Sequence, residues 1–334
     1  DRITIYEWDP STSVWIQKGN VITDQMAAAD FLGEVLELDY SGDIITFSRR
    51  AAEGYQGGNT VLQYDSNSDT WLLRGQVIRA EGGQDLQLTG ISGDGHVVLA
   101  GNCRYLGVVG QHNLRIFEWD STDSDWRLKG REFSESGRSG CQSSLSADGN
   151  TLAIQYQLDD TLATDAGAIE VYRWNDQLAD WGLKGSPILG EKANERISGF
   201  ISGHGNTVAV SVRGIPGAIR IYDWDAHSGN WVKSNADLSV DYENDRCCDR
   251  LRVNHEGSRI VVTSGAYERV EAVRIQVFGK ASDTNVYIDS DGDGVPDDID
   301  DFPFDPSASV DTDSDGLPDR WNPGYFAEDS TSTP

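Results

Sequence analysis

The chain has 334 residues and a formal net charge of −28. A net charge this negative repels partners that carry many negative charges. We therefore expect neither nucleic acid nor anionic lipid as a partner. No apolar run approaches the roughly 20 residues that a membrane-spanning helix needs, and we predict no membrane span. The four cysteines suit an oxidising compartment with one or two disulfide bonds.

An aromatic string recurs along the first 280 residues. Its copies are RITIYEWD (2–9), TVLQYD (60–65), LRIFEWD (114–120), IEVYRWN (169–175), IRIYDWD (219–225) and VRIQVF (273–278). In the first five copies, a further tryptophan stands seven residues after the last aromatic residue: Trp15, Trp71, Trp126, Trp181 and Trp231. A second element follows each of the first five copies, in which an alternating run, a glycine-containing turn and a β-branched run succeed one another.

One unit therefore reads as four short strands with two tight turns. Four strands repeated every 50–56 residues are typical of the blades of a β-propeller. A β-sandwich is the alternative, but it does not account for five aligned copies. We predict an all-β protein with a propeller of about five four-stranded blades over residues 1–280. Six or seven blades are the alternatives, if further blades precede.

The two ends of the repeat region are incomplete. Residues 1–22 supply a third and a fourth strand, and residues 250–278 supply a first, second and third. Residues 15–22 could complete the last blade, but one third strand is then surplus. The other interpretations are an extra strand at the seam, further blades upstream, or pairing with another molecule. Because an open strand edge is usually covered, we expect that the spare edge strands can mediate self-assembly.

The units resemble FG-GAP repeats, as found in integrin-α heads and bacterial surface proteins. The resemblance lies in the S-x-D-G turns and the G-x-v-R-v-Y-x-W strings that follow. It implies that the strand before each turn lines the central channel, namely residues 35–39, 87–91, 142–146, 197–201 and 250–254. The turns lack the D-x-D-x-D-G loop of the calcium-binding members, so we expect no calcium in the propeller.

The longer connections all lie on the face opposite the short turns, where a protein or glycan partner is expected to bind. All four cysteines fall on this face: Cys103, Cys141, Cys247 and Cys248. Neighbouring blades bring Cys103 and Cys141 together, which predicts a disulfide bond. The adjacent pair leaves three possibilities open, namely a vicinal disulfide, two free thiols or an intermolecular bond.

The segment 281–334 has a different composition, with fifteen acidic residues and Arg320 as its only base. Residues 289–300 and 311–322 both read D-x-D-x-D-G-[VL]-P-D-x-x-[DN]. Alternate aspartates place three carboxylates on one side of a tight loop, and glycine at the sixth position permits the sharp turn that a calcium cage needs. We therefore predict a separate Ca²⁺-binding tail.

The expected ligands are the side chains at positions 1, 3, 5 and 12, the carbonyl at position 7, and the carboxylate at position 9 directly or through water. They are Asp289, Asp291, Asp293, Val295, Asp297 and Asp300 in the first loop, and Asp311, Asp313, Asp315, Leu317, Asp319 and Asn322 in the second. With the linker DDFPFDP (300–306), these loops resemble bacterial thrombospondin type 3 repeats. That resemblance implies a secreted or cell-surface protein of a marine Gram-negative bacterium.

No catalytic motif stands out. Three histidines, His96, His204 and His255, occupy short turns, where a polar turn residue is the ordinary interpretation. Acid pairs such as Asp159 and Asp160 could serve a glycosidase, but nothing distinguishes them from other loop acids. The sequence therefore favours a non-enzymatic surface, adhesion or matrix protein with the tail as a calcium-stiffened connector. The alternatives are a lectin that uses the long-loop face and, third, a secreted glycan-active enzyme.

Overall fold

The structure is a computed structural model of the chain. It describes residues 2–23, 31–50, 58–79, 88–102, 112–135, 141–213, 217–234, 237–239, 250–264, 274–279, 295, 300–311, 316–322, 325 and 330. All regular elements within these residues are β-strands, and none of the described segments forms a helix long and apolar enough to cross a membrane. The chain divides into two compact units, residues 1–278 and 279–334.

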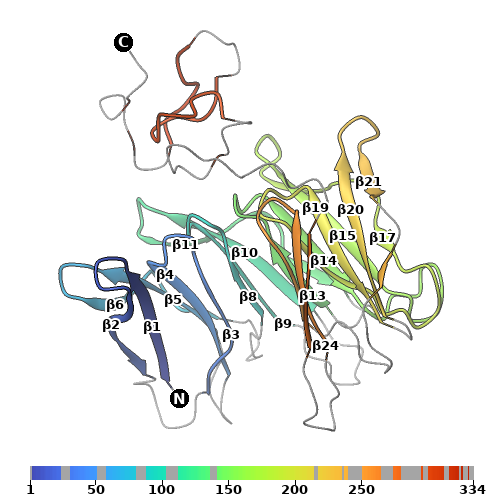
Figure 1. Cartoon of the computed structure of the whole chain (residues 1–334), viewed down its shortest axis with the longest axis horizontal. Coiled ribbons are helices and arrows are strands. Elements are labelled where there is room, and N and C mark those ends of the chain that lie inside the picture. Colours follow the sequence, from blue (N-terminus) through green and yellow to red (C-terminus); the bar gives the residue numbers. More distant parts are fainter. Residues whose placement is uncertain are drawn as a thin grey trace. The chain divides into compact units, whose positions relative to one another are not determined.

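The larger unit is a β-propeller with five blades, preceded by a two-stranded hairpin (Figure 1). The hairpin is β1 (Arg2–Asp9) and β2 (Val14–Thr23). Blade 1 is β3 (Phe31–Leu38), β4 (Ile44–Arg50), β5 (Gly58–Asp65), β6 (Thr70–Leu73) and β7 (Ile78–Arg79). Blade 2 is β8 (Leu88–Ile91), β9 (Val97–Asn102), β10 (His112–Asp120), β11 (Asp125–Leu128) and β12 (Phe133–Glu135).

The remaining blades follow the same order. Blade 3 is β13 (Cys141–Leu145), β14 (Thr151–Tyr156), β15 (Ala168–Asn175), β16 (Asp180–Leu183) and β17 (Ile188–Leu189). Blade 4 is β18 (Ser198–Ile201), β19 (Thr207–Val212), β20 (Ala218–Asp225), β21 (Asn230–Lys233) and β22 (Leu238–Ser239). Blade 5 is β23 (Arg250–Val253), β24 (Arg259–Ser264) and β25 (Arg274–Gly279). The all-β, five-bladed architecture expected from the repeats is confirmed.

The fourth strand of blades 1–4 is broken in two, where a single strand was expected. A short strand, such as β17 after β16, resumes pairing with the third strand of the same blade. The break contains a glycine in blades 1–3, and Gly130 has a φ of +74°, a backbone region that glycine enters at little cost. A Cβ at Gly130 would lie 2.8 Å from the Trp174 ring of the next blade, so this turn also admits the neighbouring indole.

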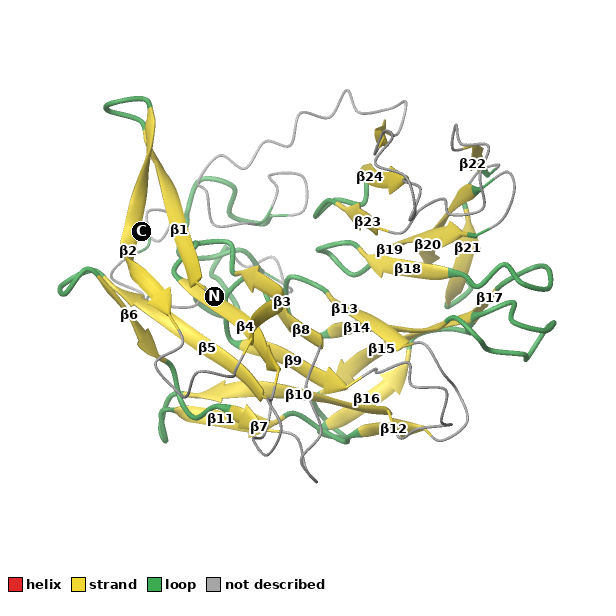
Figure 2. Ribbon diagram, turned by 90° about the horizontal axis from the view of Figure 1, so that it is seen from below, coloured by secondary structure: helices red, strands yellow, loops and turns green. Residues whose placement is uncertain are grey.

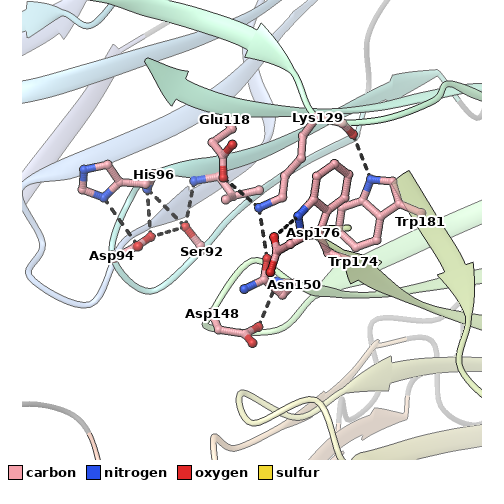
Figure 3. A network of polar contacts seen from close by, with 11 residues as sticks. Ser92, Asp94, His96, Glu118, Lys129, Asp148, Asn150, Trp174, Asp176 and Trp181 are labelled. Atoms are coloured by element: carbon pink, nitrogen blue, oxygen red, sulfur yellow. Dashed lines mark hydrogen bonds and ion pairs between the residues drawn. The ribbon is translucent and has the colours of Figure 1, made fainter. Parts of the chain in front are cut away.

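In blades 1–4, the tryptophan of the fourth strand bonds the blade to the unit before it. The four indole N–H groups donate to main-chain carbonyls of the preceding unit: Trp71 to Lys18 (2.9 Å), Trp126 to Arg74 (2.8 Å), Trp181 to Lys129 (2.8 Å) and Trp231 to Lys184 (2.7 Å). At the Lys129 junction, the ammonium group also binds Glu118 Oε1 at 2.8 Å and Asn150 Oδ1 at 3.0 Å (Figure 3). The core therefore lies between blades.

The N-terminal hairpin takes the place of half a blade in front of blade 1. Ile5 and Ile22 pack with Ile45, Phe47 and Trp71 in one buried cluster. Within the described residues, β2 pairs with β1 alone and blade 5 keeps three strands. The interpretation in which residues 15–22 complete the last blade is therefore wrong, because the hairpin is already packed as a blade against β6.

In the smaller unit, the described residues form turns held by one isolated bridge between Ala308 and Trp321. Phe302 and Ala308 are buried, and so is Asp305. The Asp305 carboxylate accepts hydrogen bonds from the main-chain N–H of Ser307 at 3.1 Å and from its hydroxyl at 2.6 Å. The linker between the two predicted calcium loops is thus an ordered turn around a buried carboxylate.

Candidate functional site

A cavity of about 320 Å³ lies inside the propeller, lined by the first strands of all five blades and by the turns that follow them. These strands, β3, β8, β13, β18 and β23, follow one another around the inside of the ring (Figure 2). The expectation that the strands before the short turns line the channel is confirmed. The cavity lies at the short-turn end of these strands. The long-loop face, where a partner was expected, falls largely outside the described residues.

One position in each inner strand faces the cavity in the same register. Each of these residues pairs with the same place in the second strand of its blade, as Glu37 does with Thr46 and Arg252 with Val261. The five equivalent residues are Glu37, Gly90, Ser144, Phe200 and Arg252. Two of the five are charged, and their charges are opposite.

Glu37 is held by the neighbouring blade. Its Oε2 accepts a hydrogen bond from the main-chain N–H of Ile91 at 3.3 Å. Burial raises the pKa of Glu37 above the ordinary value of a glutamate, while the charge of Arg252 and the Ile91 N–H lower it less strongly. A carboxyl group in such surroundings can take up and release a proton nearer to neutral pH than an exposed one.

Arg252 lines the same cavity and belongs to β23 of blade 5, the last blade in the chain. Its guanidinium carbon lies 4.3 Å from the centre of the Phe200 ring, a cation–π contact. Nη1 donates to the carbonyl of Leu251 at 2.9 Å. These two contacts orient the guanidinium plane, and the side chain remains solvent-exposed, so its other N–H groups can bind an anion.

The mouth of the cavity is formed by the turns. Main-chain hydrogen bonds join successive turns: Tyr40 N to Gly93 O (2.9 Å), Gly93 N to Ala147 O (2.7 Å), Ala147 N to Gly203 O (2.8 Å) and His204 N to His255 O (3.1 Å). The Tyr40 hydroxyl and His255 Nδ1, 3.0 Å apart, link blade 1 to blade 5. The inner ring of the propeller is thereby closed at this end.

His255 is more than a polar turn residue. Its ring lies 4.7 Å from that of His204, and burial lowers its pKa, while the charges of Glu256 and Asp148 act in the opposite direction. It is therefore neutral near pH 7. A Cβ at Gly203 would lie 2.2 Å from His255 Nδ1, so only glycine leaves room for this imidazole at the mouth.

The predicted calcium ligands are described in part. The second loop shows the expected turn: Gly316 has a φ of +84° and its N–H donates to Asp311 Oδ2 at 2.9 Å. Asp319 N donates to the Val310 carbonyl at 2.8 Å, and Asn322 N to that of Ser307 at 2.7 Å. No cluster of three or more acidic, histidine or cysteine residues at metal-binding distance occurs in the part of the chain that the structure describes.

The other predicted ligands and cysteines carry less structural information. Val295, Asp300 and Leu317 are described, and six ligands lie outside the described residues: Asp289, Asp291, Asp293, Asp297, Asp313 and Asp315. Cys103, Cys247 and Cys248 also lie outside them, and Cys141 is described only as part of β13. The calcium cages and the disulfide bonds therefore stay predictions.

Only the comparison with solved structures finds similar proteins. No protein-family model and no curated protein matches the sequence. Among solved structures, a candidate 6-phosphogluconolactonase from Bacteroides fragilis is 15% identical, with a TM-score of 0.49, over 84% of this chain and 73% of that one. The periplasmic gluconolactonase of Pseudomonas aeruginosa is 14% identical, with a TM-score of 0.49, over 83% and 77%. The propeller domain of the Trilobed protease from Pyrococcus furiosus is 11% identical, with a TM-score of 0.44, over 77% and 73%.

These findings correct the expected function. The sequence favoured a non-enzymatic adhesion or matrix protein, but structures similar to this chain are named as lactonases. The non-enzymatic interpretation is therefore not retained. At 10–15% identity the likeness concerns the fold alone, so the activity has to be argued from the residues of this chain.

Proposed function

We propose that the propeller is a hydrolase that adds water to a small ester or lactone in the channel cavity. The observation that supports this proposal is the pair Glu37 and Arg252. They are the only charged residues among the five equivalent inner positions, and they face one cavity. A proton acceptor and a fixed positive charge are the two groups that acyl hydrolysis by water needs.

Glu37 acts as the general base. Its ionised carboxylate takes a proton from water as the water oxygen forms a bond to the acyl carbon. When the acyl carbon–oxygen bond breaks, the carboxyl returns this proton to the leaving oxygen, so that an acid and an alcohol are released. Burial, which raises the pKa of Glu37, brings the group nearer to the working pH and makes it a stronger base than an exposed carboxylate.

Arg252 supplies the positive charge. Its guanidinium group, oriented by the Phe200 ring, either holds an anionic group of the substrate or stabilises the negative charge that develops on the acyl oxygen. At the mouth, the Tyr40 hydroxyl and the neutral His255 ring offer donors and acceptors for substrate hydroxyls. Ser144 adds a hydroxyl group on the inner wall.

The cavity volume limits the substrate. About 320 Å³ lies at the lower end of the range of ligand pockets, which suits one sugar-sized ring rather than a polymer. The strongly acidic chain disfavours large polyanions, whereas Arg252 accommodates a single carboxylate or phosphate. The proposed substrate class is therefore a small hydroxylated lactone or ester, neutral or with one anionic group.

A turnover screen tests this proposal. The full chain is incubated with five- and six-membered sugar lactones, each with and without a carboxylate or phosphate, and with short nitrophenyl esters. We expect hydrolysis of at least one lactone or ester above background. Arg252→Gln should raise KM at least about tenfold for the anionic members, whereas Arg127→Gln, at an exposed position of β11, should leave it unchanged. A complete lack of turnover, or equal effects of both variants, would refute it.

We propose in addition that the tail unit binds Ca²⁺ through the two aspartate loops. The hydrogen bond from Gly316 N to Asp311 Oδ2 and the positive φ of Gly316 support this proposal, since they form the turn in which the first and sixth positions of such a loop meet. The ligands would be the twelve residues named from the sequence. Bound calcium would offset the repulsion between the acidic side chains of this unit.

Calorimetric titration of the full chain with CaCl₂ is expected to show two binding events. Replacing Asp311 by asparagine should remove one of them or weaken it at least tenfold, because the loop loses a charged ligand. Asp176→Asn, a substitution in an exposed propeller turn, is the matched control and should change neither event. Absence of calcium uptake by the unaltered chain would refute the calcium sites.

A further inference from the structure

Every complete junction between blades has two sides, and the structure shows four of them. The later blade contributes the tryptophan of its fourth strand, which is buried against the blade before it in every case: Trp71 (7% exposed), Trp126 (9%), Trp181 (2%) and Trp231 (8%). The earlier blade contributes aliphatic residues of its third strand: Ile116 of β10 is buried in one cluster with Trp181, and Val171 of β15 in one cluster with Trp231. The sequence repeats thus encode a reusable interface.

The hairpin carries the first side of this interface without a partner. Its Trp8 and Trp15 pair across the strands and meet edge to face at 5.7 Å, as Trp224 and Trp231 do at 5.3 Å in blade 4. Trp15 is nevertheless 66% exposed, and Trp8 is 49% exposed. Among the blades that the structure describes, none pairs with or packs on that face of β1 and β2.

Blade 5 carries the second side without a partner. Alignment of Phe278 with Trp224 places Ile275 of β25 at the position of Ile221 in β20. Ile221 is 9% exposed, whereas Ile275 and Val277 are 67% and 65% exposed. The molecule therefore presents both halves of one blade-to-blade interface, the hairpin face (Tyr6, Trp8 and Trp15) and the β25 face (Ile275 and Val277).

We propose that the hairpin face of one copy docks on the β25 face of a second copy. Both faces are exposed in the same molecule, so they do not cover each other, and an apolar surface of this kind marks a contact site. A second copy is the partner that fits, because the same two kinds of face already meet at the four internal junctions. Because the two faces differ, the association is head-to-tail and can continue beyond a dimer.

The test is the mass of the full chain in solution, measured by light scattering after size exclusion over a hundredfold range of concentration. The wild-type mass should increase with concentration. Trp15→Arg and Ile275→Arg should each be monomeric, because each has lost one face. A mixture of these two variants should form a dimer and stop there, since only one intact pair of faces remains. Leu128→Arg, at an exposed position of β11, should associate like the wild type.

Two results would overturn the proposal. One is a wild-type chain that stays monomeric at the highest concentration, and the other is a mixture of the two variants without dimers. In the first case, a lower melting temperature of Trp15→Arg would show that the hairpin closes onto its own chain. Far-ultraviolet circular dichroism of each variant establishes that it is folded, as expected for substitutions at exposed positions.

Discussion

Replacing Glu37 by glutamine is expected to lower kcat on the best substrate by about 10²–10⁴-fold, the usual contribution of a general base. Glutamine has nearly the same shape and can still accept the hydrogen bond from Ile91 N, but it takes no proton from water. KM should change little, because Arg252 and the mouth residues remain. Glu118→Gln, an exposed carboxylate of β10, is the control and should retain full activity.

The pH dependence provides an independent check. Activity should rise with pH through the raised pKa of Glu37, since the base must be ionised. Removing the charge of Arg252, which lowers this pKa, should move the rise to higher pH. Because the pKa of Glu37 is raised in the folded state, the protonated carboxyl stabilises the folded state at low pH. This contribution to the free energy of unfolding is lost as the pH rises through the folded-state pKa. Glu37→Gln should therefore remain folded at neutral pH, so a variant that unfolds there would contradict the assignment.

Replacing Trp181 by alanine should destabilise the propeller by about 3–5 kcal/mol, the usual cost of deleting a buried aromatic side chain. Trp181 is 2% exposed, and its indole N–H donates to the carbonyl of Lys129 at 2.8 Å. Trp181→Phe keeps most of the packing and leaves that carbonyl without its donor, so a loss of about 1–3 kcal/mol is expected. Denaturant unfolding of the two variants measures both values.

Trp15 provides the matched control for this measurement. It occupies the equivalent place in the hairpin, but it is 66% exposed. In dilute solution, Trp15→Ala should therefore change the free energy of unfolding by less than about 0.5 kcal/mol. Equal losses at Trp15 and Trp181 would contradict the view that the tryptophans stabilise the fold by packing between blades.

The five-bladed fold could be predicted because the residues that repeat are the ones that form the contacts between blades. The paired aromatic residues and the glycine turns recur every 50–56 residues, and both belong to the junctions between blades. The broken fourth strands were not predicted, and the place of the N-terminal strand pair was left open between several alternatives. The period of the sequence pattern indicates which residues form strands. It does not indicate which strand edge remains free after the blades have packed, and the pairing of a surplus strand depends on that edge.

The candidate site was missed for a related reason. Glu37 and Arg252 differ from their counterparts in the other blades, so a search for what repeats passes over them. His255 was interpreted as an ordinary turn residue, because its contact with Tyr40 joins residues 215 positions apart. The available signal was the aligned inner position itself, at which two of five residues are charged. Residues that interrupt a repeat on its inner face are therefore the ones to examine first.

The most direct test of the central claim is a crystal structure of the Glu37→Gln variant with the lactone or ester that the wild type hydrolyses fastest. We expect the compound inside the channel cavity, with its acyl carbon near residue 37 and an oxygen bound by Arg252. A compound bound at any other surface, with the channel cavity empty, would contradict the account.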